Sequence, residues 1–340
     1  MTQRLSRRQF IGTAGASAIT IAANLELPSR QTSKSSVSLS SSSLLDVKQI
    51  DAGVLNVGYA DVGPADGPAV ILLHGWPYDI HSYAEVAQRL AIKGYRVVVP
   101  YQRGYGSTRF RSDDTMRNGQ QASFAVDTID LMNALGIKRA VIGGFDWGSR
   151  TAAIIGALWP ERCKALVCVS GYLIVNREVN RQPLPPKAEL GWWYQYYFAT
   201  ERGKRGYEKN RYEFNKLIWR LASPAWSFDD VTFDRTAASF NNADHVAVVI
   251  HNYRWRLSLA DGEPRYDALE EKLIPGPAIR VPAVTIASDF DGSAAGGAAY
   301  AKRFVGKYSH RILKGIGHNV PQEAPEAFGQ AIEDAAHFHP

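Results

Sequence analysis

Asp146 lies where a predicted strand gives way to a predicted helix, and it is flanked by glycines. Residues 140–149 read Ala-Val-Ile-Gly-Gly-Phe-Asp-Trp-Gly-Ser. Gly144 and Gly148 leave room for a sharp turn that lifts the Asp146 side chain clear of its neighbours. A carboxylate there is ionised at neutral pH, is favoured by the helix N-terminus, and can displace a leaving group from a saturated carbon. The sequence therefore predicts a nucleophilic aspartate that forms an ester, which water then hydrolyses.

Two further positions supply what such an aspartate needs for turnover. His318, in the run Gly-Ile-Gly-His-Asn, follows the last predicted strand and is the predicted base that activates water. Asp291 follows an earlier strand and is the predicted acid that orients His318, with Asp289 as a competitor for that role. The backbone N–H groups of Trp76, in the run His-Gly-Trp-Pro, and of Trp147 are the predicted oxyanion donors.

The elements that must position these residues alternate between short apolar runs and helical patterns. Near-continuous apolar runs are typical of strands buried on both faces of a parallel sheet. Eight strands are predicted, at residues 48–50, 55–61, 69–73, 96–100, 140–145, 165–170, 283–288 and 310–313. Helices are predicted at residues 82–92, 123–135, 147–158 and 295–304 and from residue 322 onward. The pattern indicates an α/β fold with a mostly parallel sheet and helices on both of its faces.

This alternation breaks between residues 175 and 276, which have helical spacing and few strand signals. Five of the eight tryptophans fall in this segment, which is also rich in tyrosine, arginine and glutamate. We expect a helical lid at 175–276, inserted after the sixth strand into a core formed by 46–174 and 277–340. The aromatic residues predict a small-molecule substrate with a bulky apolar or aromatic group.

The motifs around residues 74–77 and 143–149, with the order nucleophile, acid, histidine along the chain, resemble those of the epoxide hydrolases of the α/β-hydrolase fold. The resemblance covers nearly everything after residue 46. Tyr194, in Tyr-Gln-Tyr-Tyr-Phe, is similar to the first lid tyrosine of that family, and Tyr253, in Asn-Tyr-Arg, resembles the second. The resemblance implies that both hydroxyls hold the epoxide oxygen, that the product is a vicinal diol, and that no cofactor or metal takes part.

Two other functions compete with this interpretation. Haloalkane and haloacetate dehalogenases use the same aspartate, and Trp147 stands where haloalkane enzymes keep a halide-binding tryptophan. Haloacetate enzymes grip a carboxylate with an arginine at the position of Arg150, which we interpret here as a charge on the helix surface. They also have a His-Trp pair where this chain has Tyr194-Gln195, and their acid follows strand six, where this chain has Ser170-Gly171. The third possibility is an exported binding protein without catalytic activity.

The N-terminal arm accounts for most of the net charge of +6. Residues 1–45 hold five basic residues against the single acid Glu26, so the rest of the chain is nearly neutral and predicts no nucleic-acid partner. Residues 1–28 contain the pair Arg7–Arg8 and a weakly apolar run, which resembles a twin-arginine export signal. Residues 29–45 are serine-rich and are a predicted linker. We expect the twin-arginine translocase to deliver the protein to the periplasm or beyond, without stable membrane insertion.

The export prediction can be tested by replacing Arg7 and Arg8 with lysines. The charge is kept but the paired guanidinium groups are lost, so the variant should stay in the cytoplasm. Cell fractionation with antibody detection measures the distribution. Unchanged export of the Lys-Lys variant would contradict the prediction.

Overall fold

The computed structural model describes residues 46–338, apart from the side chains of Ser293 and Ala294. The predicted signal peptide (1–28) and linker (29–45) lie outside the described residues, so both stay predictions. Within residues 46–338, no helix combines the length and the apolar character needed to cross a membrane.

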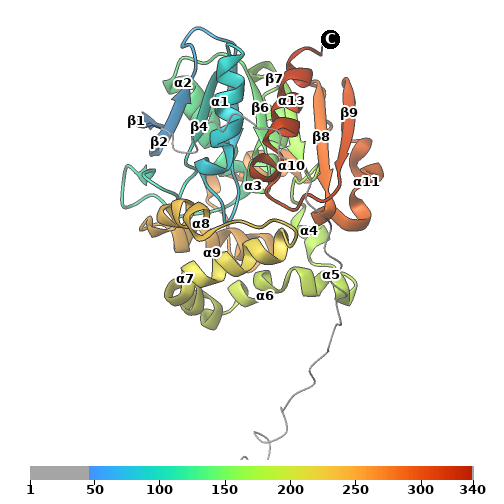
Figure 1. The fold of residues 1–340 in the computed structure, drawn as a ribbon. Coiled ribbons are helices and arrows are strands. Elements are labelled where there is room, and N and C mark those ends of the chain that lie inside the picture. Colours follow the sequence, from blue (N-terminus) through green and yellow to red (C-terminus); the bar gives the residue numbers. More distant parts are fainter. Residues whose placement is uncertain (1–45, 339–340) are drawn as a thin grey trace, which may run out of the picture. The chain divides into compact units, whose positions relative to one another are not determined.

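A nine-stranded sheet forms the centre of the fold (Figure 1). Its strands are β1 (Val47–Ala52), β2 (Leu55–Val62), β3 (Ala69–Leu73), β4 (Arg96–Pro100), β5 (Arg109–Phe110), β6 (Ala140–Gly144), β7 (Cys163–Val169), β8 (Ala283–Ser288) and β9 (Tyr308–Leu313). The order is β1-β2-β4-β3-β6-β7-β8-β9, with β5 beside β2. The pairs from β4 to β9 are parallel, whereas β2 pairs antiparallel with β1, β4 and β5. All eight predicted strands are present, and β5 is too short to carry a periodic signal.

Helices cover both faces of this sheet (Figure 1). They include α1 (Ala84–Ile92), α2 (Gln121–Ala134), α3 (Trp147–Leu158) and α13 (Pro325–Ala336). Successive side chains of a strand point to opposite faces. Val70 of β3 accordingly belongs to the apolar cluster that contains α1 and α13 residues, whereas Ile71 belongs to the one formed with α2 and α3. Burial of the strands on both faces explains why their sequences are apolar without alternation.

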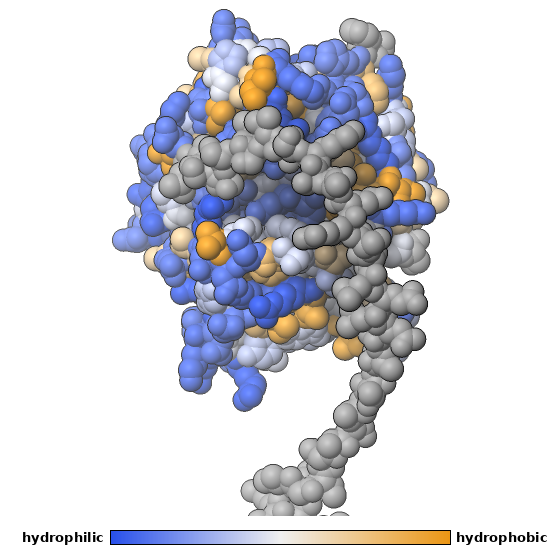
Figure 2. All heavy atoms as spheres, viewed as in Figure 1, coloured by the Kyte–Doolittle hydropathy of each residue, from blue (hydrophilic) through white to orange (hydrophobic). Residues whose placement is uncertain are grey.

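All regular elements described between residues 175 and 276 are helical. They are α4 (Arg177–Asn180), α5 (Pro186–Gly191), α6 (Trp193–Ala199), α7 (Glu201–Ala222), α8 (Asp230–Ala237), η3 (Ala238–Asn241), α9 (His245–Arg256), η4 (Pro264–Tyr266) and α10 (Asp267–Leu273). Figure 1 shows α5 to α9 grouped at one end of the sheet. The viewed face is mostly hydrophilic, with scattered hydrophobic residues (Figure 2).

Two predicted helices near the C-terminus differ from the structure. Within the segment predicted as one helix at 295–304, only the four residues of α11 (Ala298–Ala301) are α-helical, and the short helix η5 (Asp289–Ala294) precedes the segment. Gly297, directly before α11, takes a positive φ of 69°, which shortens the helix at its start. The final predicted helix is divided into α12 (Val320–Glu323) and α13 at Pro325, which lacks the N–H needed to continue a helix.

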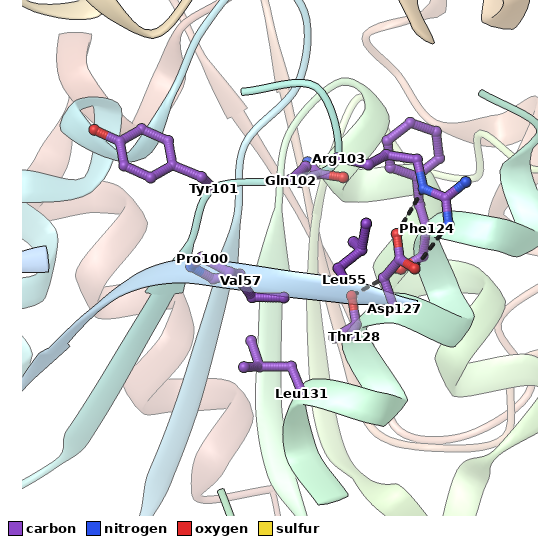
Figure 3. Close-up of a pocket in the computed structure, with 10 residues that line it drawn as sticks. All are labelled: Leu55, Val57, Pro100, Tyr101, Gln102, Arg103, Phe124, Asp127, Thr128 and Leu131. Atoms are coloured by element: carbon purple, nitrogen blue, oxygen red, sulfur yellow. Dashed lines mark hydrogen bonds and ion pairs between the residues drawn. The ribbon is translucent and has the colours of Figure 1, made fainter. Parts of the chain in front are cut away.

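A buried ion pair fastens the loop that follows β4 to helix α2 (Figure 3). Arg103 is fully buried, and its Nε and Nη2 donate to the two carboxylate oxygens of Asp127, each at 2.7 Å. Nη1 donates to the backbone and side-chain oxygens of Asn118. The preceding Gln102 donates its backbone N–H to His74 Nε2 and its side-chain amide to the His74 carbonyl. The loop thus connects α2 to the segment after β3, where Trp76 lies.

Replacing Asp127 with alanine should leave the Arg103 charge buried without its carboxylate partner. We expect a loss of about 3 to 5 kcal/mol in the free energy of unfolding, the usual cost of breaking a buried pair. Glu85→Ala, which removes the exposed partner of Arg89 on α1, is the control and should cost less than about 0.5 kcal/mol beyond helix propensity. Urea unfolding followed by circular dichroism measures both. Equal losses would mean that Arg103 is not held as described.

Candidate active site

Asp146 occupies a strained turn between β6 and α3. Its φ of 51° and ψ of −122° lie outside the regions that most side-chain-bearing residues adopt. The turn is possible because its neighbours are small: a Cβ on Gly148 would overlap the Leu73 carbonyl, and one on Gly144 would overlap the Gly148 backbone. The predicted sharp turn at Asp146 is therefore present, and it presents the carboxylate at the N-terminus of α3.

The Asp146 carboxylate accepts a backbone hydrogen bond from the core. The Trp76 N–H donates to Oδ1 at 2.8 Å. Burial acts to raise the pKa of Asp146, but contact with His318, the charge of Arg150 and the Trp147 N–H together outweigh it and hold the pKa below its ordinary value. The carboxylate is therefore ionised at neutral pH, and the Trp76 N–H holds its Oδ1.

His318 faces the second carboxylate oxygen of Asp146. Its Nε2 lies 3.7 Å from Asp146 Oδ2, which is too long for a good hydrogen bond but close enough for both groups to contact one water. The ring packs against Phe290, with 4.2 Å between ring centroids. The His318 backbone N–H donates to Ser223 Oγ and to the Ala222 carbonyl at the end of α7. The sequence-predicted nucleophile and base thus lie together.

The predicted acid does not hydrogen-bond to His318 in the structure. Asp291 Oδ2 instead accepts from the Ser288 N–H, three residues earlier, and Asp289 accepts from the Gly315 N–H. His318 Nδ1 is buried and has no hydrogen-bond partner among the described residues. The assignment of Asp291, or of Asp289, as the acid that orients His318 stays a prediction.

Glu323 is a site residue that the sequence did not reveal. Its Oε1 accepts from Ser223 Oγ at 2.6 Å and from the Asn319 N–H at 3.0 Å, and its Oε2 accepts from the Gly317 N–H at 2.7 Å. These bonds bracket His318 on both sides and fix its loop. The only sequence signal is an acid five residues after the histidine, which is too common a spacing to be informative.

Tyr194 of α6 and Tyr253 of α9 lie against each other above the sharp turn that carries Asp146, which we call the elbow. Their ring centroids are 5.4 Å apart, and they lie 5.0 and 5.3 Å from the Trp76 ring. Burial, followed by the charge of Asp146, raises the pKa of Tyr194, and burial raises that of Tyr253 well above the ordinary value, so both remain hydrogen-bond donors at neutral pH. A pocket in the lid and core is lined by Trp76, Asp146, Trp192, Trp193, Tyr194 and His318, among others.

A buried hydrogen-bond chain ties the Trp76 side chain to the lid. Trp76 Nε1 donates to the Tyr207 hydroxyl at 2.9 Å, and that hydroxyl lies 2.8 Å from His245 Nε2. His245 Nδ1 lies 2.9 Å from the Gly104 carbonyl, which can only accept, so Nδ1 carries the proton and neutral Nε2 accepts from Tyr207. Tyr207 and His245 were not predicted, because a contact between residues 76 and 207 leaves no local pattern.

Arg150 is buried, so its interpretation from the sequence as a charge on the helix surface is wrong. Its exposed fraction is 5%, and its Nε donates to the Leu173 carbonyl at 3.1 Å. This burial depends on tertiary packing, which the helix pattern alone does not show.

Comparison with known proteins supports the same fold. Residues 68–206 match the family described as the alpha/beta hydrolase fold. A crystal structure of a proposed epoxide hydrolase from Klebsiella pneumoniae is 55% identical, with a TM-score of 0.84, and the match covers 86% of this chain and 97% of that one. A proposed epoxide hydrolase from Pseudomonas aeruginosa, 20% identical with a TM-score of 0.72 over 86% of this chain and 97% of its own, shows the fold alone.

Among curated proteins, epoxide hydrolase B of Mycobacterium tuberculosis is 33% identical over 150 residues, which are 40% of this chain and 41% of that protein. The match thus spans about two fifths of that relative's length. The fold, the elbow aspartate and these matches together establish that the chain belongs to the α/β-hydrolase family. Within that family it is an enzyme of the epoxide hydrolase-like type.

The two buried histidines beside the site predict a loss of stability in mild acid. Burial is the main cause that lowers the pKa of His74 from 6.5 to about 4 and that of His245 from 6.5 to about 3. Below pH 6.5 these two histidines are protonated in the unfolded chain but remain neutral in the folded chain. The free energy of unfolding therefore falls by about 1.4 kcal/mol per pH unit for each histidine until its folded pKa is reached.

Urea midpoints measured between pH 7 and pH 5 test this expectation. The variant His245→Gln should lose stability less steeply than the wild type over that range, because one of the two groups no longer titrates. Parallel slopes for the two proteins would refute it.

Proposed function

We propose that this enzyme opens epoxides to vicinal diols through a covalent ester on Asp146. The observation that carries the proposal is the meeting of Tyr194 and Tyr253, from two lid helices, above an ionised carboxylate whose Oδ1 is held by the Trp76 N–H. Two neutral hydroxyl donors facing a carboxylate suit a substrate whose leaving group is an oxygen attached to the attacked carbon. The relatives described as epoxide hydrolases support the same reaction.

In the first step, Asp146 Oδ2 attacks an epoxide carbon. The bond between that carbon and the ring oxygen breaks, and its electron pair moves to the oxygen, which Tyr194 and Tyr253 hold and to which one of them gives its proton. The product is an alkyl ester of Asp146, whose Oδ1 is now the carbonyl oxygen and still lies against the Trp76 N–H. The negative charge has passed from the carboxylate to the tyrosine side of the pocket.

In the second step, His318 Nε2 removes a proton from water as the water oxygen attacks the Asp146 carbonyl carbon. The N–H groups of Trp76 and Trp147 stabilise the oxyanion that forms. Collapse expels the diol and restores the Asp146 carboxylate. The two protons of the water end on the released hydroxyl and on the tyrosine that gave up its proton, so the balance is epoxide plus water to diol.

Dehalogenation by the same aspartate is a second candidate, because of one observation. The Trp147 indole Nε1 is buried and has no hydrogen-bond partner within the described residues. An indole N–H beside the nucleophile can hold a departing halide. In this alternative, halide is released and Tyr194 and Tyr253 are packing residues.

Incubation of the purified protein with a panel of epoxides and haloacids decides between these candidates. We expect diol without halide, and a single turnover in heavy-oxygen water should place the label in Asp146. The double variant Tyr194→Phe, Tyr253→Phe should slow diol formation by about 100-fold or more, the scale for lost oxyanion donors.

Tyr197→Phe, which removes a hydroxyl from the same helix as Tyr194, is the matched control and should keep full activity. Halide release without diol would support the dehalogenase, and unlabelled Asp146 after turnover would eliminate the covalent route.

A further inference from the structure

Two arginines that this mechanism does not use lie beside the tyrosine pair. Arg256 is the last residue of α9, three positions after Tyr253, and its guanidinium carbon lies 5.6 Å from the Tyr253 ring centroid. Its Nε is buried and has no hydrogen-bond partner in the part of the chain that the structure describes. Arg150, one turn after Asp146 on α3, is also buried and donates its Nε to the Leu173 carbonyl.

Several arginines around the lid and core are neutralised by ion pairs. Arg103 pairs with Asp127, and Arg254, two residues before Arg256, pairs with Glu201. Within residues 46–338, neither Arg150 nor Arg256 forms such an ion pair with a carboxylate. Burial and the neighbouring Arg256 lower the pKa of Arg150 to about 10, so it still carries its charge at neutral pH. Arg150 is buried and Arg256 is half-buried, so two neighbouring like charges without an ion-paired carboxylate are costly unless an anion forms beside them.

We propose that Arg256 stabilises the negative charge that develops on the epoxide oxygen between Tyr194 and Tyr253. The inference rests on the proposed function and adds a positioning residue to it, because Arg256 acts through the tyrosines and is not among the residues that line the pocket.

The direction in which negative charge moves during ring opening explains how Arg256 accelerates that step. Burial is the main influence on the pKa of Tyr194 and of Tyr253, and the charge of Arg256 opposes it at both. The positive charges that act on Asp146 come instead from His318 and Arg150. Ring opening therefore moves negative charge away from Asp146 and toward Arg256. A fixed charge that is closer to the product of a step than to its reactant lowers the barrier of that step.

Single-turnover kinetics of Arg256→Gln test the proposal, because ester formation and ester hydrolysis can be followed separately. We expect ester formation to slow by about 10- to 100-fold, which corresponds to one charge lost several ångströms away at a partly screened site. Hydrolysis of the ester should keep its rate, and Arg256→Lys should recover most of the first step. If Arg256→Gln does not fold, Arg256→Met covers the Tyr253 ring with a similar volume and replaces it.

Arg177→Gln is the matched control. Its guanidinium also lies over an aromatic ring, that of Trp255, and its Nε is also buried without a partner among residues 46–338. This variant should form the ester at the wild-type rate.

Three results would overturn the proposal while leaving the proposed function intact: an unchanged rate of ester formation, equal slowing of both steps, or a raised KM confined to epoxides that carry a carboxylate. The last result would mean that the guanidinium binds the substrate's own anion. A wild-type enzyme that forms no ester from any epoxide would instead refute the proposed function, and this inference with it.

Discussion

The hydrogen bond from the Trp76 backbone N–H to Asp146 joins the two halves of the site. The same residue sends its indole N–H to Tyr207 in the lid, and its ring packs against Tyr194 and Tyr253. One residue therefore contacts both the proposed nucleophile, which the core carries, and the proposed hydroxyl donors, which the lid carries. Reaction geometry is sensitive to displacements of about 1 Å, so the lid and the elbow must be built around Trp76 together.

Burial acts to raise the pKa of each acidic group of the site, but the net result differs between the groups. It raises the pKa of Tyr194 and Tyr253 and keeps them protonated, which a hydrogen-bond donor requires. At Asp146 the same burial is outweighed by His318, Arg150 and the Trp147 N–H, so the carboxylate stays ionised, as a nucleophile requires. Different partners in one buried pocket thus keep the tyrosines protonated and the carboxylate ionised.

The sequence predicts the sheet and the elbow well because both depend on local patterns: apolar runs for buried strands, and small residues at Gly144 and Gly148 for the turn. It fails where packing between distant segments decides. The helix pattern predicts Arg150 as a surface charge, but the packed structure buries it. The acid that orients His318 depends on how a glycine-rich loop closes. Asp291 accepts a bond within its own turn, and its assignment as that acid stays a prediction. The Trp76–Tyr207 bond spans 131 positions and has no local signature.

The contact between the end of α7 and His318 has a consequence for how such enzymes diverge. The histidine backbone N–H is satisfied by Ser223 and by the Ala222 carbonyl, both at the C-terminal end of that lid helix, and Ser223 also donates to Glu323. A lid grafted from a relative whose corresponding helix ends one turn earlier would leave that amide without a partner and Glu323 short of one of its donors. Exchange of the whole lid would therefore disturb the loop that carries His318, whereas a substitution elsewhere in the lid leaves these bonds in place.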